Sequence, residues 1–235
     1  IAAAVSGHFL RNPLAQSLPR KFKIAFDGCP GGACASPNIH DIGGVAALRD
    51  GRRGFRLFVG GGLGNTPKPA RLLEEWTAEE EVVRTAHAIL EVFNRDGERK
   101  NRNRARLKFL VEKIGWEEFL RRVLETREAI PPGLGHERLN AARRSTDESE
   151  PVTLSWPSPE PRDPVYASWK SLNVVPQRQP GFSAVHVLLP IGDVRAAQLH
   201  GVAKAAALYG DGHVRATRWQ NVMLRWVRNE NLPAL

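Results

Sequence analysis

Hydrophobic and polar residues follow strand-like patterns in two segments near the start of the chain. Residues 21–26 (KFKIAF) alternate basic and apolar side chains, which predicts a half-buried strand with Lys21 and Lys23 on one face. Residues 54–61 (GFRLFVGG) predict a second strand that runs into a glycine-rich stretch. Residues 27–44, between the two, are rich in Gly, Pro, Asn and Asp and predict a loop.

A helical pattern follows the second strand. Thr77 and Glu80 have the spacing of a capping box, and apolar residues then recur at helical spacing from Val82 until Gly97. The pattern predicts an amphipathic helix with one buried face. A further helix, beginning at Trp116, is expected to pack against it.

A shorter helix is predicted between these two. Its apolar stripe lies within residues 107–114, and Gly115 ends it. Arg104 and Lys108 are expected to lie side by side on one flank of this helix, and Arg106 on the opposite flank.

The composition changes after the third helix. Residues 131–164 are rich in Pro, Ser, Glu and Arg with little periodicity, which predicts a linker or a long extended connection. Beyond it, residues 184–189 predict a strand, Asp193 caps an alanine-rich helix, and residues 214–227 predict a hairpin that turns at 218–221. This βαββ order makes up a large part of a ferredoxin-like α+β sandwich.

Length and hydropathy fit a globular chain of one or two domains. It has 235 residues, of which 42% are hydrophobic. No apolar run approaches the roughly 18 residues that cross a bilayer, and the first residues lack the pattern of a signal peptide, so we expect a cytoplasmic protein with no membrane partner. The chain starts with Ile1 and its one methionine is Met223, so we expect it to be a fragment.

The charge predicts an anionic partner without identifying it. A net charge of +9 and a pI near 10.1 suit nucleic acid, carboxylate-rich cofactors, inorganic oxyanions or acidic proteins equally well. The two cysteines, Cys29 and Cys34, cannot form a disulfide framework, and the pair indicates a reducing compartment. Together with His40 they supply only three of the four ligands of a structural zinc site, so no metal site is predicted.

Several motifs occur in an order that resembles the sirohaem-dependent nitrite and sulfite reductase haemoproteins. The first group is LPRKFKIAF, HDIG, VGGGLG and RNRARLKFLVEKIG, and the second is NVVPQRQPG, GD and VRATRWQN. Together they span most of the chain outside residues 131–164. Ordered motifs of this kind are far more specific than any one of them alone.

The resemblance implies an α+β architecture that corresponds to the middle of a longer enzyme. Residues 1–130 would be the sirohaem-binding α/β module of the first half, residues 131–164 a linker, and residues 165–235 the ferredoxin-like module of the second half. In the family the second half also carries four cysteines that hold a 4Fe-4S cluster. The cofactors implied are therefore sirohaem and a 4Fe-4S cluster whose ligands lie outside this chain, in the remainder of the same polypeptide.

The resemblance also assigns site residues. Lys21 and Lys23 match the two lysines that face the sirohaem and hold the anionic substrate, a role that fixed cations can fulfil by stabilising oxyanion charge. Five further candidates would contact the cofactor or its edge, namely Arg104, Arg106, Lys108, Arg218 and Asn221. Guanidinium groups suit the eight carboxylate-bearing arms of sirohaem.

The reaction implied is the six-electron reduction of nitrite or sulfite, with ferredoxin or a similar acidic carrier as the electron donor. Two alternatives remain. The basic run at residues 99–108 would suit an RNA-binding protein, although the predicted strands lack paired aromatic residues that stack on bases, so a nucleic-acid partner is not expected. A cobalamin-pathway enzyme of the precorrin-3B synthase type is built from the same halves.

Overall fold

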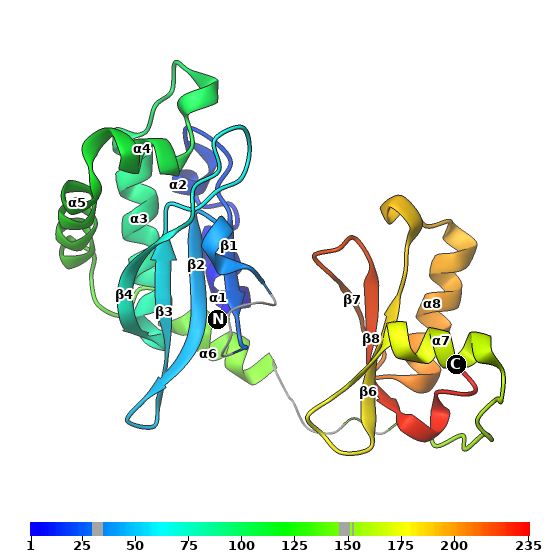
Figure 1. Ribbon diagram of the computed structural model, residues 1–235. Coiled ribbons are helices and arrows are strands. Elements are labelled where there is room, and N and C mark those ends of the chain that lie inside the picture. The colour runs from blue at the N-terminus through cyan, green and yellow to red at the C-terminus, as the bar shows by residue number, and fades with distance from the viewer. Residues whose placement is uncertain (30–34, 146–150, 152) are drawn as a thin grey trace. The chain divides into compact units, whose positions relative to one another are not determined.

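The computed structural model describes residues 1–29, 35–145, 151 and 153–235, and these residues form an α+β protein. The contacts between residues divide the chain into two compact units, Ile1–Asp147 and Glu148–Leu235. Each unit contains a four-stranded sheet, and Figure 1 shows this sheet together with the helices of the unit. No helix within the described ranges is long and apolar enough to cross a membrane.

The sheet of the first unit has the strand order β1-β2-β3-β4. The strands are β1 (Ile24–Asp27), β2 (Ile42–Arg49), β3 (Arg52–Val59) and β4 (Arg71–Ala78). Strand β1 is parallel to β2, and the other neighbours are antiparallel. Strand β3 overlaps the strand that was predicted at residues 54–61. Strands β2 and β4 were not predicted, and β2 starts at Ile42, within the predicted loop.

The first predicted strand was placed too early. Strand β1 begins at Ile24, so Lys21 and Lys23 precede it. The strand starts late because the Lys23 N–H donates to the side-chain carboxylate of Asp41 at 2.9 Å instead of to a neighbouring strand. The ladder with β2 starts only at Ile24. The two lysines therefore lie on an irregular segment that leads into the edge strand.

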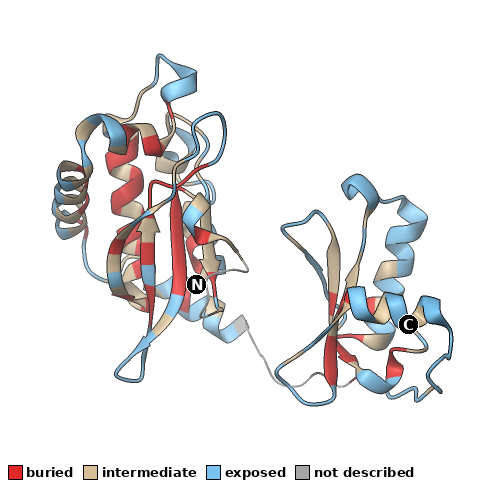
Figure 2. Ribbon diagram, viewed as in Figure 1, coloured by how far each residue is buried: buried red, intermediate tan, exposed pale blue. Residues whose placement is uncertain are grey.

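Helix α3 (Val82–Asp96) forms the centre of the core of this unit. Its residues Val82, Ile89 and Phe93 are almost completely buried, against strand residues such as Leu57 and Val59 (Figure 2). This amphipathic helix was predicted, because its apolar face is continuous. Other helices of the unit are α1 (Ala2–Phe9), α2 (Pro13–Gln16), α4 (Leu107–Ile114) and α5 (Trp116–Ala129).

The predicted capping box at the start of α3 was wrong. Thr77 lies in strand β4, and its hydroxyl bonds to the Glu74 carboxylate instead of to a helical N–H. A 3₁₀ turn, Glu79–Glu81, separates the strand from the helix, so Glu80 does not occupy a position in the first turn of α3. Thr77 and Glu80 have the three-residue spacing of a capping box, but Thr77 is in a strand and Glu80 is in a 3₁₀ turn, so neither is at the start of an α-helix.

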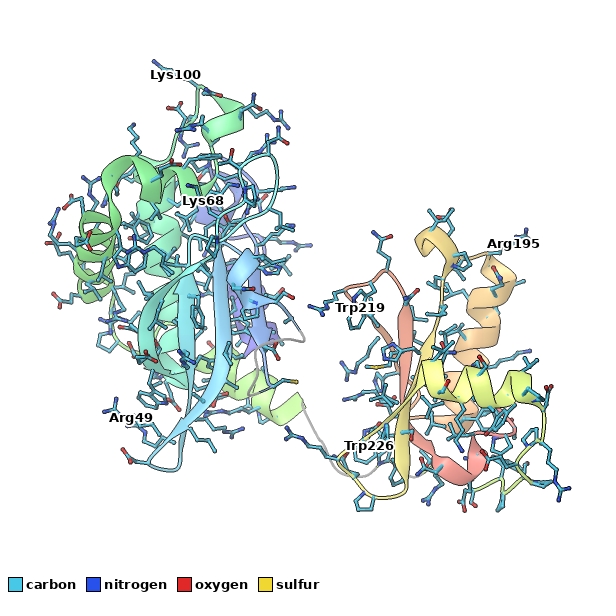
Figure 3. All side chains as sticks on the ribbon, viewed as in Figure 1. Arg49, Lys68, Lys100, Arg195, Trp219 and Trp226 are labelled. Carbon is cyan, nitrogen blue, oxygen red and sulfur yellow. The ribbon has the colours of Figure 1, made fainter. Side chains whose placement is uncertain are left out.

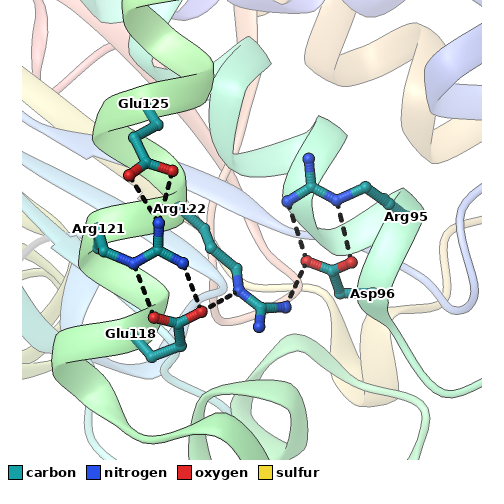
Figure 4. Close-up of polar contacts among 6 residues, drawn as sticks. All are labelled: Arg95, Asp96, Glu118, Arg121, Arg122 and Glu125. Atoms are coloured by element: carbon teal, nitrogen blue, oxygen red, sulfur yellow. Dashed lines mark hydrogen bonds and ion pairs between the residues drawn. The ribbon is translucent and has the colours of Figure 1, made fainter.

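An ion-pair network joins the end of α3 to α5, as drawn in Figure 4. The Arg122 guanidinium donates to Glu118 at 2.7 Å and to Asp96 at 3.0 Å, and Asp96 also accepts from Arg95. Hydrogen bonds from Arg121 and Arg122 lower the pKa of the Glu118 carboxyl to about 2. The network lies at the surface, where such pairs contribute little to stability, and the buried apolar residues carry the packing.

The short helix α4 begins later than the basic residues that were assigned to it. Arg104 lies in a 3₁₀ turn, Arg102–Arg104, and Arg106 is the N-cap residue of α4. The prediction that Arg104 and Lys108 are neighbours on one helical face was therefore wrong. The extended conformation of Arg106 (φ −80°, ψ 154°) breaks the helical spacing between them.

The predicted irregular connection over residues 131–164 contains a helix, α6 (His136–Ser145). Leu139 of this helix is buried in the core that includes Ala4 and Val5 of α1. This part of the prediction was wrong because the helix has a single short apolar side and many arginines, so its periodicity is weak.

The second unit contains an antiparallel sheet in the order β5-β6-β8-β7. Its strands are β5 (Val174–Pro176), β6 (Phe182–Val187), β7 (Val214–Ala216) and β8 (Val222–Arg228). Its helices are α7 (Pro164–Asn173) and α8 (Ala196–Tyr209). The predicted strand, helix and hairpin are confirmed, and β5 and α7 were missed.

The predicted cap of α8 was wrong. The N-cap residue is Arg195, whose backbone N–H donates to Oε1 of Gln198 at 3.0 Å, and Asp193 lies outside the helix. A small core of Val185, Ala206, Leu224 and Val227 packs between α8 and the sheet. The amide of Asn231, completely buried, accepts from the Trp156 N–H at 2.6 Å and donates to the Leu154 carbonyl at 2.8 Å, which fixes the segment that leads into this unit.

Replacing Phe93 by alanine tests which interactions hold the first unit together. The ring is fully buried and lies 5.6 Å from the Phe22 ring. We expect Phe93→Ala to lower the free energy of unfolding by about 3–5 kcal/mol, because a large cavity is left. Chemical denaturation measures this, with Arg121→Gln, at an exposed surface pair, as the control that should leave the free energy of unfolding nearly unchanged. Equal effects of the two variants would contradict the account.

Candidate functional site

A cleft of about 530 Å³ lies in the first unit, at the end of the sheet where β1 begins and β3 ends. Four segments line it: the chain before β1, the turn that precedes β2, the loop after β3 and the chain that enters α4. The lining residues are Arg20, Lys21, Lys23, Ile39, His40, Leu63, Gly64, Asn65, Thr66, Arg102, Asn103, Arg104, Arg106, Lys108 and Phe109. Figure 3 labels Lys68, at the end of the loop after β3, and Lys100, which lies outside the cleft.

The charge of the cleft is entirely of one sign. Seven of its fifteen lining residues are Lys or Arg, and none of the described lining residues is Asp or Glu. A concave surface with charges of one sign raises the local concentration of the opposite ion. The cleft is therefore suited to an anion, and to one with several negative groups in particular.

The five site residues that were predicted in this unit all line the same cleft. Lys21 and Lys23 approach it from the segment before β1, and Arg104, Arg106 and Lys108 from the segment that enters α4. The side chains of Lys21 and Lys23 are exposed, and no described residue forms a hydrogen bond or ion pair with their ammonium groups. These two charges are available to a ligand.

Arg106 differs from the two lysines because its charge is already paired. Its Nη2 donates to both carboxylate oxygens of Asp41, at 3.0 and 2.9 Å. The Asp41 side chain is fully buried and that of Arg106 is 13% exposed. Within the described structure the buried Nε of Arg106 has no hydrogen-bond partner.

Burial raises the pKa of the Asp41 carboxyl above its ordinary value, because the charged form is poorly solvated in the interior. The nearby Arg106 charge and the hydrogen bonds from Arg106 and the Lys23 N–H act in the opposite direction. A buried carboxylate of this kind requires its partner, and removal of the guanidinium would leave it without compensation.

Lys108 is also occupied by the protein itself. Its ammonium group donates to the backbone carbonyls of Leu63 at 3.1 Å and Thr66 at 2.5 Å, with a longer contact to Gly62 at 3.4 Å. The residue is only 5% exposed, and burial, followed by the charge of Arg106, lowers the pKa of its amine. An ammonium group has three N–H donors, so these carbonyls use them all.

Close backbone packing shapes the loop after β3. A Cβ atom on Gly61 would lie 2.6 Å from the Asn38 carbonyl oxygen and 2.7 Å from that of His40. At Gly62 it would lie 2.9 Å from Nη2 of Arg106. Glycine is therefore required at residue 61 by the backbone, while at residue 62 it leaves space for the guanidinium.

Some residues of the cleft were not singled out from the sequence. Arg20 directly precedes Lys21 in the motif that carries the resemblance, and this adjacency was the signal that could have identified it. Asn65 and Thr66 come from the loop, where residue type alone gave no signal. Asp41 does not line the cleft, and its position behind the cationic side chains could not be read from the spacing of the motif.

Arg218 and Asn221 lie in the second unit, at the turn between β7 and β8. The Asn221 side chain accepts from the Leu189 N–H at 2.8 Å, which joins the turn to the end of β6, and its backbone N–H bonds to the Thr217 hydroxyl. The Arg218 guanidinium lies 4.5 Å from the centre of the Trp219 ring, which Figure 3 labels. Their contact with a cofactor stays a prediction.

Metal ligands do not gather among the described residues: no group of three or more His, Cys, Asp or Glu side chains there could hold an ion. Cys29 is half-buried, and Cys34 lies outside the described residues. His40 uses Nδ1 in a hydrogen bond with the Ser36 carbonyl at 2.9 Å.

The basic run at residues 99–108 is not a free cationic helix. Arg99 donates to the carbonyls of Ser17 and Asn94, both at 2.9 Å, and Arg106 and Lys108 have the internal partners described above. The run therefore contributes to the wall of the cleft. The internal bonds of Arg99, Arg106 and Lys108 leave fewer charges of this run for a nucleic acid than the RNA-binding alternative assumed.

Two family models match the chain. Residues 1–131 match the nitrite and sulphite reductase 4Fe-4S domain, and residues 175–235 match the nitrite/sulfite reductase ferredoxin-like half domain. Among solved structures, the Mycobacterium tuberculosis NirA protein is similar over 97% of this chain and 38% of its own, with 28% identity and a TM-score of 0.66.

Curated relatives agree with the family models. The ferredoxin–nitrite reductase of Synechococcus elongatus is 34% identical over 93% of the chain, and the chloroplastic ferredoxin–nitrite reductase of Zea mays is 33% identical over all of it. The chain spans 38% of the length of each. It belongs to the nitrite and sulfite reductase family.

Proposed function

We propose that this chain is part of a ferredoxin-dependent nitrite reductase, and that the cationic cleft of its first unit binds nitrite together with the carboxylates of sirohaem. The observation that carries the proposal is the convergence of seven Lys and Arg side chains on one cleft without an acidic lining residue in the described structure. The names of the relatives favour nitrite over sulfite as the substrate.

The predicted site residues divide into those whose charges are exposed and those whose charges have partners within the protein. Lys21, Lys23 and Arg104 carry exposed charges, so they are the residues that we propose to contact nitrite or a sirohaem carboxylate. Arg106 and Lys108 have internal partners, and we propose that they support the walls of the cleft. Arg218 and Asn221 remain candidates for the edge of the cofactor.

When bound, sirohaem supplies the redox chemistry. The chain's own contribution is electrostatic: the ammonium groups of Lys21 and Lys23 would hold nitrite by charge-assisted hydrogen bonds and stabilise negative charge that develops on its oxygens. They would also donate protons at the oxygens as these are removed as water.

A 4Fe-4S cluster does not fit this chain alone. Such a cluster is usually held by four cysteine thiolates, and the sequence has two cysteines. We propose that the cluster ligands lie in a part of the protein outside this sequence, and we assign no step of the reaction to residues of this chain through the cluster.

Ferredoxin is the proposed electron donor, as the names of the relatives indicate for those proteins. The net charge of +9 supports this, since an acidic electron carrier is attracted to a basic surface and the attraction weakens with salt. The cobalamin-pathway alternative has no comparable support, because the relatives reported above are named as nitrite reductases.

Neutralising either lysine tests the proposal. In the full-length protein we expect Lys21→Gln and Lys23→Gln each to lower kcat/KM for nitrite by roughly 10- to 100-fold, since each removes a hydrogen bond to a charged group. Steady-state kinetics with reduced ferredoxin measures the loss. Lys100→Gln is the matched control, because Lys100 is exposed but does not line the cleft, and its kcat/KM should not change. Unchanged kinetics in both lysine variants would refute the proposed site.

Lys108→Met should make the loop after β3 less rigid, whatever its effect on ligand binding. Loss of the ammonium group leaves the carbonyls of Leu63 and Thr66 without their partner, so we expect faster hydrogen exchange over residues 60–68 and a stability loss of about 1–3 kcal/mol. Exchange followed by mass spectrometry checks this. Lys113→Met, on the exposed face of the same helix, should leave that exchange unchanged. A rigid loop in Lys108→Met would show that Lys108 does not support it.

A further inference from the structure

We infer that Asp41 is a positioning residue of the anion site: its buried carboxylate, paired with Arg106, fixes the backbone at Lys23 and so sets where the Lys23 ammonium group can reach. The inference rests on the proposed function, because it assumes that Lys23 binds the anion. It goes beyond that proposal by assigning a role to a residue that does not itself line the cleft.

Asp41 joins the segments that build the cleft. Its side chain accepts the Lys23 N–H at 2.9 Å and both bonds from Nη2 of Arg106. Its backbone carbonyl accepts the Gly60 N–H at 2.9 Å, and the neighbouring Ile42 N–H donates to the Lys23 carbonyl at 3.1 Å. The start of β1, the loop after β3 and the N-terminus of α4 therefore meet at one buried residue, Asp41: the first and last bond to its carboxylate, and the loop bonds to its backbone carbonyl.

The backbone at Lys23 depends on the bond to Asp41 because Lys23 directly precedes the edge strand β1. Strand β1 is at the edge, and its ladder with β2 begins at the next residue, Ile24. The Asp41 carboxylate thus takes the place of a strand partner for the Lys23 N–H. Since no described residue holds the ammonium group, its position follows from the backbone at residue 23, and a displacement of about 1 Å can strongly weaken a positioned contact.

A substitution at Gly62 can disturb the Asp41–Arg106 pair without changing either of the two residues. A methyl group at this residue would lie 2.9 Å from Nη2 and 3.2 Å from Cζ of Arg106. The obstructed atoms are at the end of a flexible side chain, and the backbone of Gly62 is outside the left-handed region, so alanine can be accommodated if Arg106 moves. Gly62→Ala therefore disturbs the Asp41–Arg106 pair without removing either charge.

The experiment compares Asp41→Asn and Gly62→Ala in the full-length protein. We expect both to raise the KM and the dissociation constant for nitrite by roughly 10-fold or more, with a smaller change in kcat, because the anion contact is displaced while the reacting centre is kept. Equilibrium titration with nitrite gives the dissociation constant independently of turnover. A role in folding alone would lower the melting temperature without this change in affinity.

Matched controls separate position from general destabilisation. Asp96→Asn removes another carboxylate that pairs with two arginines, outside the cleft, and Gly201→Ala adds a methyl group where nothing lies within 4 Å. Both should bind nitrite normally. If Asp41→Asn does not fold, Gly62→Ala decides the question alone.

The outcomes distinguish this inference from the proposed function. If Lys21→Gln and Lys23→Gln weaken nitrite binding while Asp41→Asn and Gly62→Ala do not, the inference is wrong and the proposed site stands. If the lysine variants bind nitrite normally, the proposed site is wrong and the role of Asp41 fails with it. Weaker binding in all four variants supports both.

Discussion

Electrostatic repulsion is the constraint on which the architecture of the cleft depends. Seven lysine and arginine side chains meet there, and like charges a few ångströms apart repel by about 1–4 kcal/mol per pair near a protein surface. The fold offsets this repulsion from behind the cleft. Asp41 neutralises Arg106, and the carbonyls of the loop after β3 accept the hydrogen bonds of the Lys108 ammonium group.

This division separates charges that build the cleft from charges that are free to bind. Arg106 and Lys108 are largely buried and have internal partners, whereas Lys21, Lys23 and Arg104 are exposed at its surface. A ligand with several negative groups would relieve the repulsion among the exposed charges. The same electrostatics therefore explains why the cleft can exist in the folded chain and why it should prefer an anion.

The sequence predicted the elements whose burial pattern is regular. Helix α3 has a continuous apolar face, and strand β3 alternates clearly, so both were found. Strand β2 was not predicted, because Gly43 and Gly44 at its start resemble loop residues; here they allow close packing, since a Cβ on Gly43 would meet the Pro37 carbonyl oxygen at 2.2 Å. Helix α6 was missed because its apolar side is narrow.

The resemblance to the family predicted the site residues, but the partners of their charged groups were visible only in the tertiary structure. All five predicted residues of the first unit line one cleft, although the expected pairing of Arg104 with Lys108 on a helix was wrong. The contact of Asp41 with Arg106 joins residues 65 positions apart, and no local pattern encodes it. Spacing within a motif indicates which charges are present, whereas only the packing shows which of them are already neutralised.

The most direct test of this account is a crystal structure of the full-length protein with nitrite bound. The account predicts that nitrite lies in the cleft of the first unit, with an oxygen within hydrogen-bonding distance of the Lys21 or Lys23 ammonium group. It also predicts that Arg106 remains paired with Asp41. Nitrite bound away from both lysines, or an Arg106 guanidinium that leaves Asp41 to hold the anion, would contradict it.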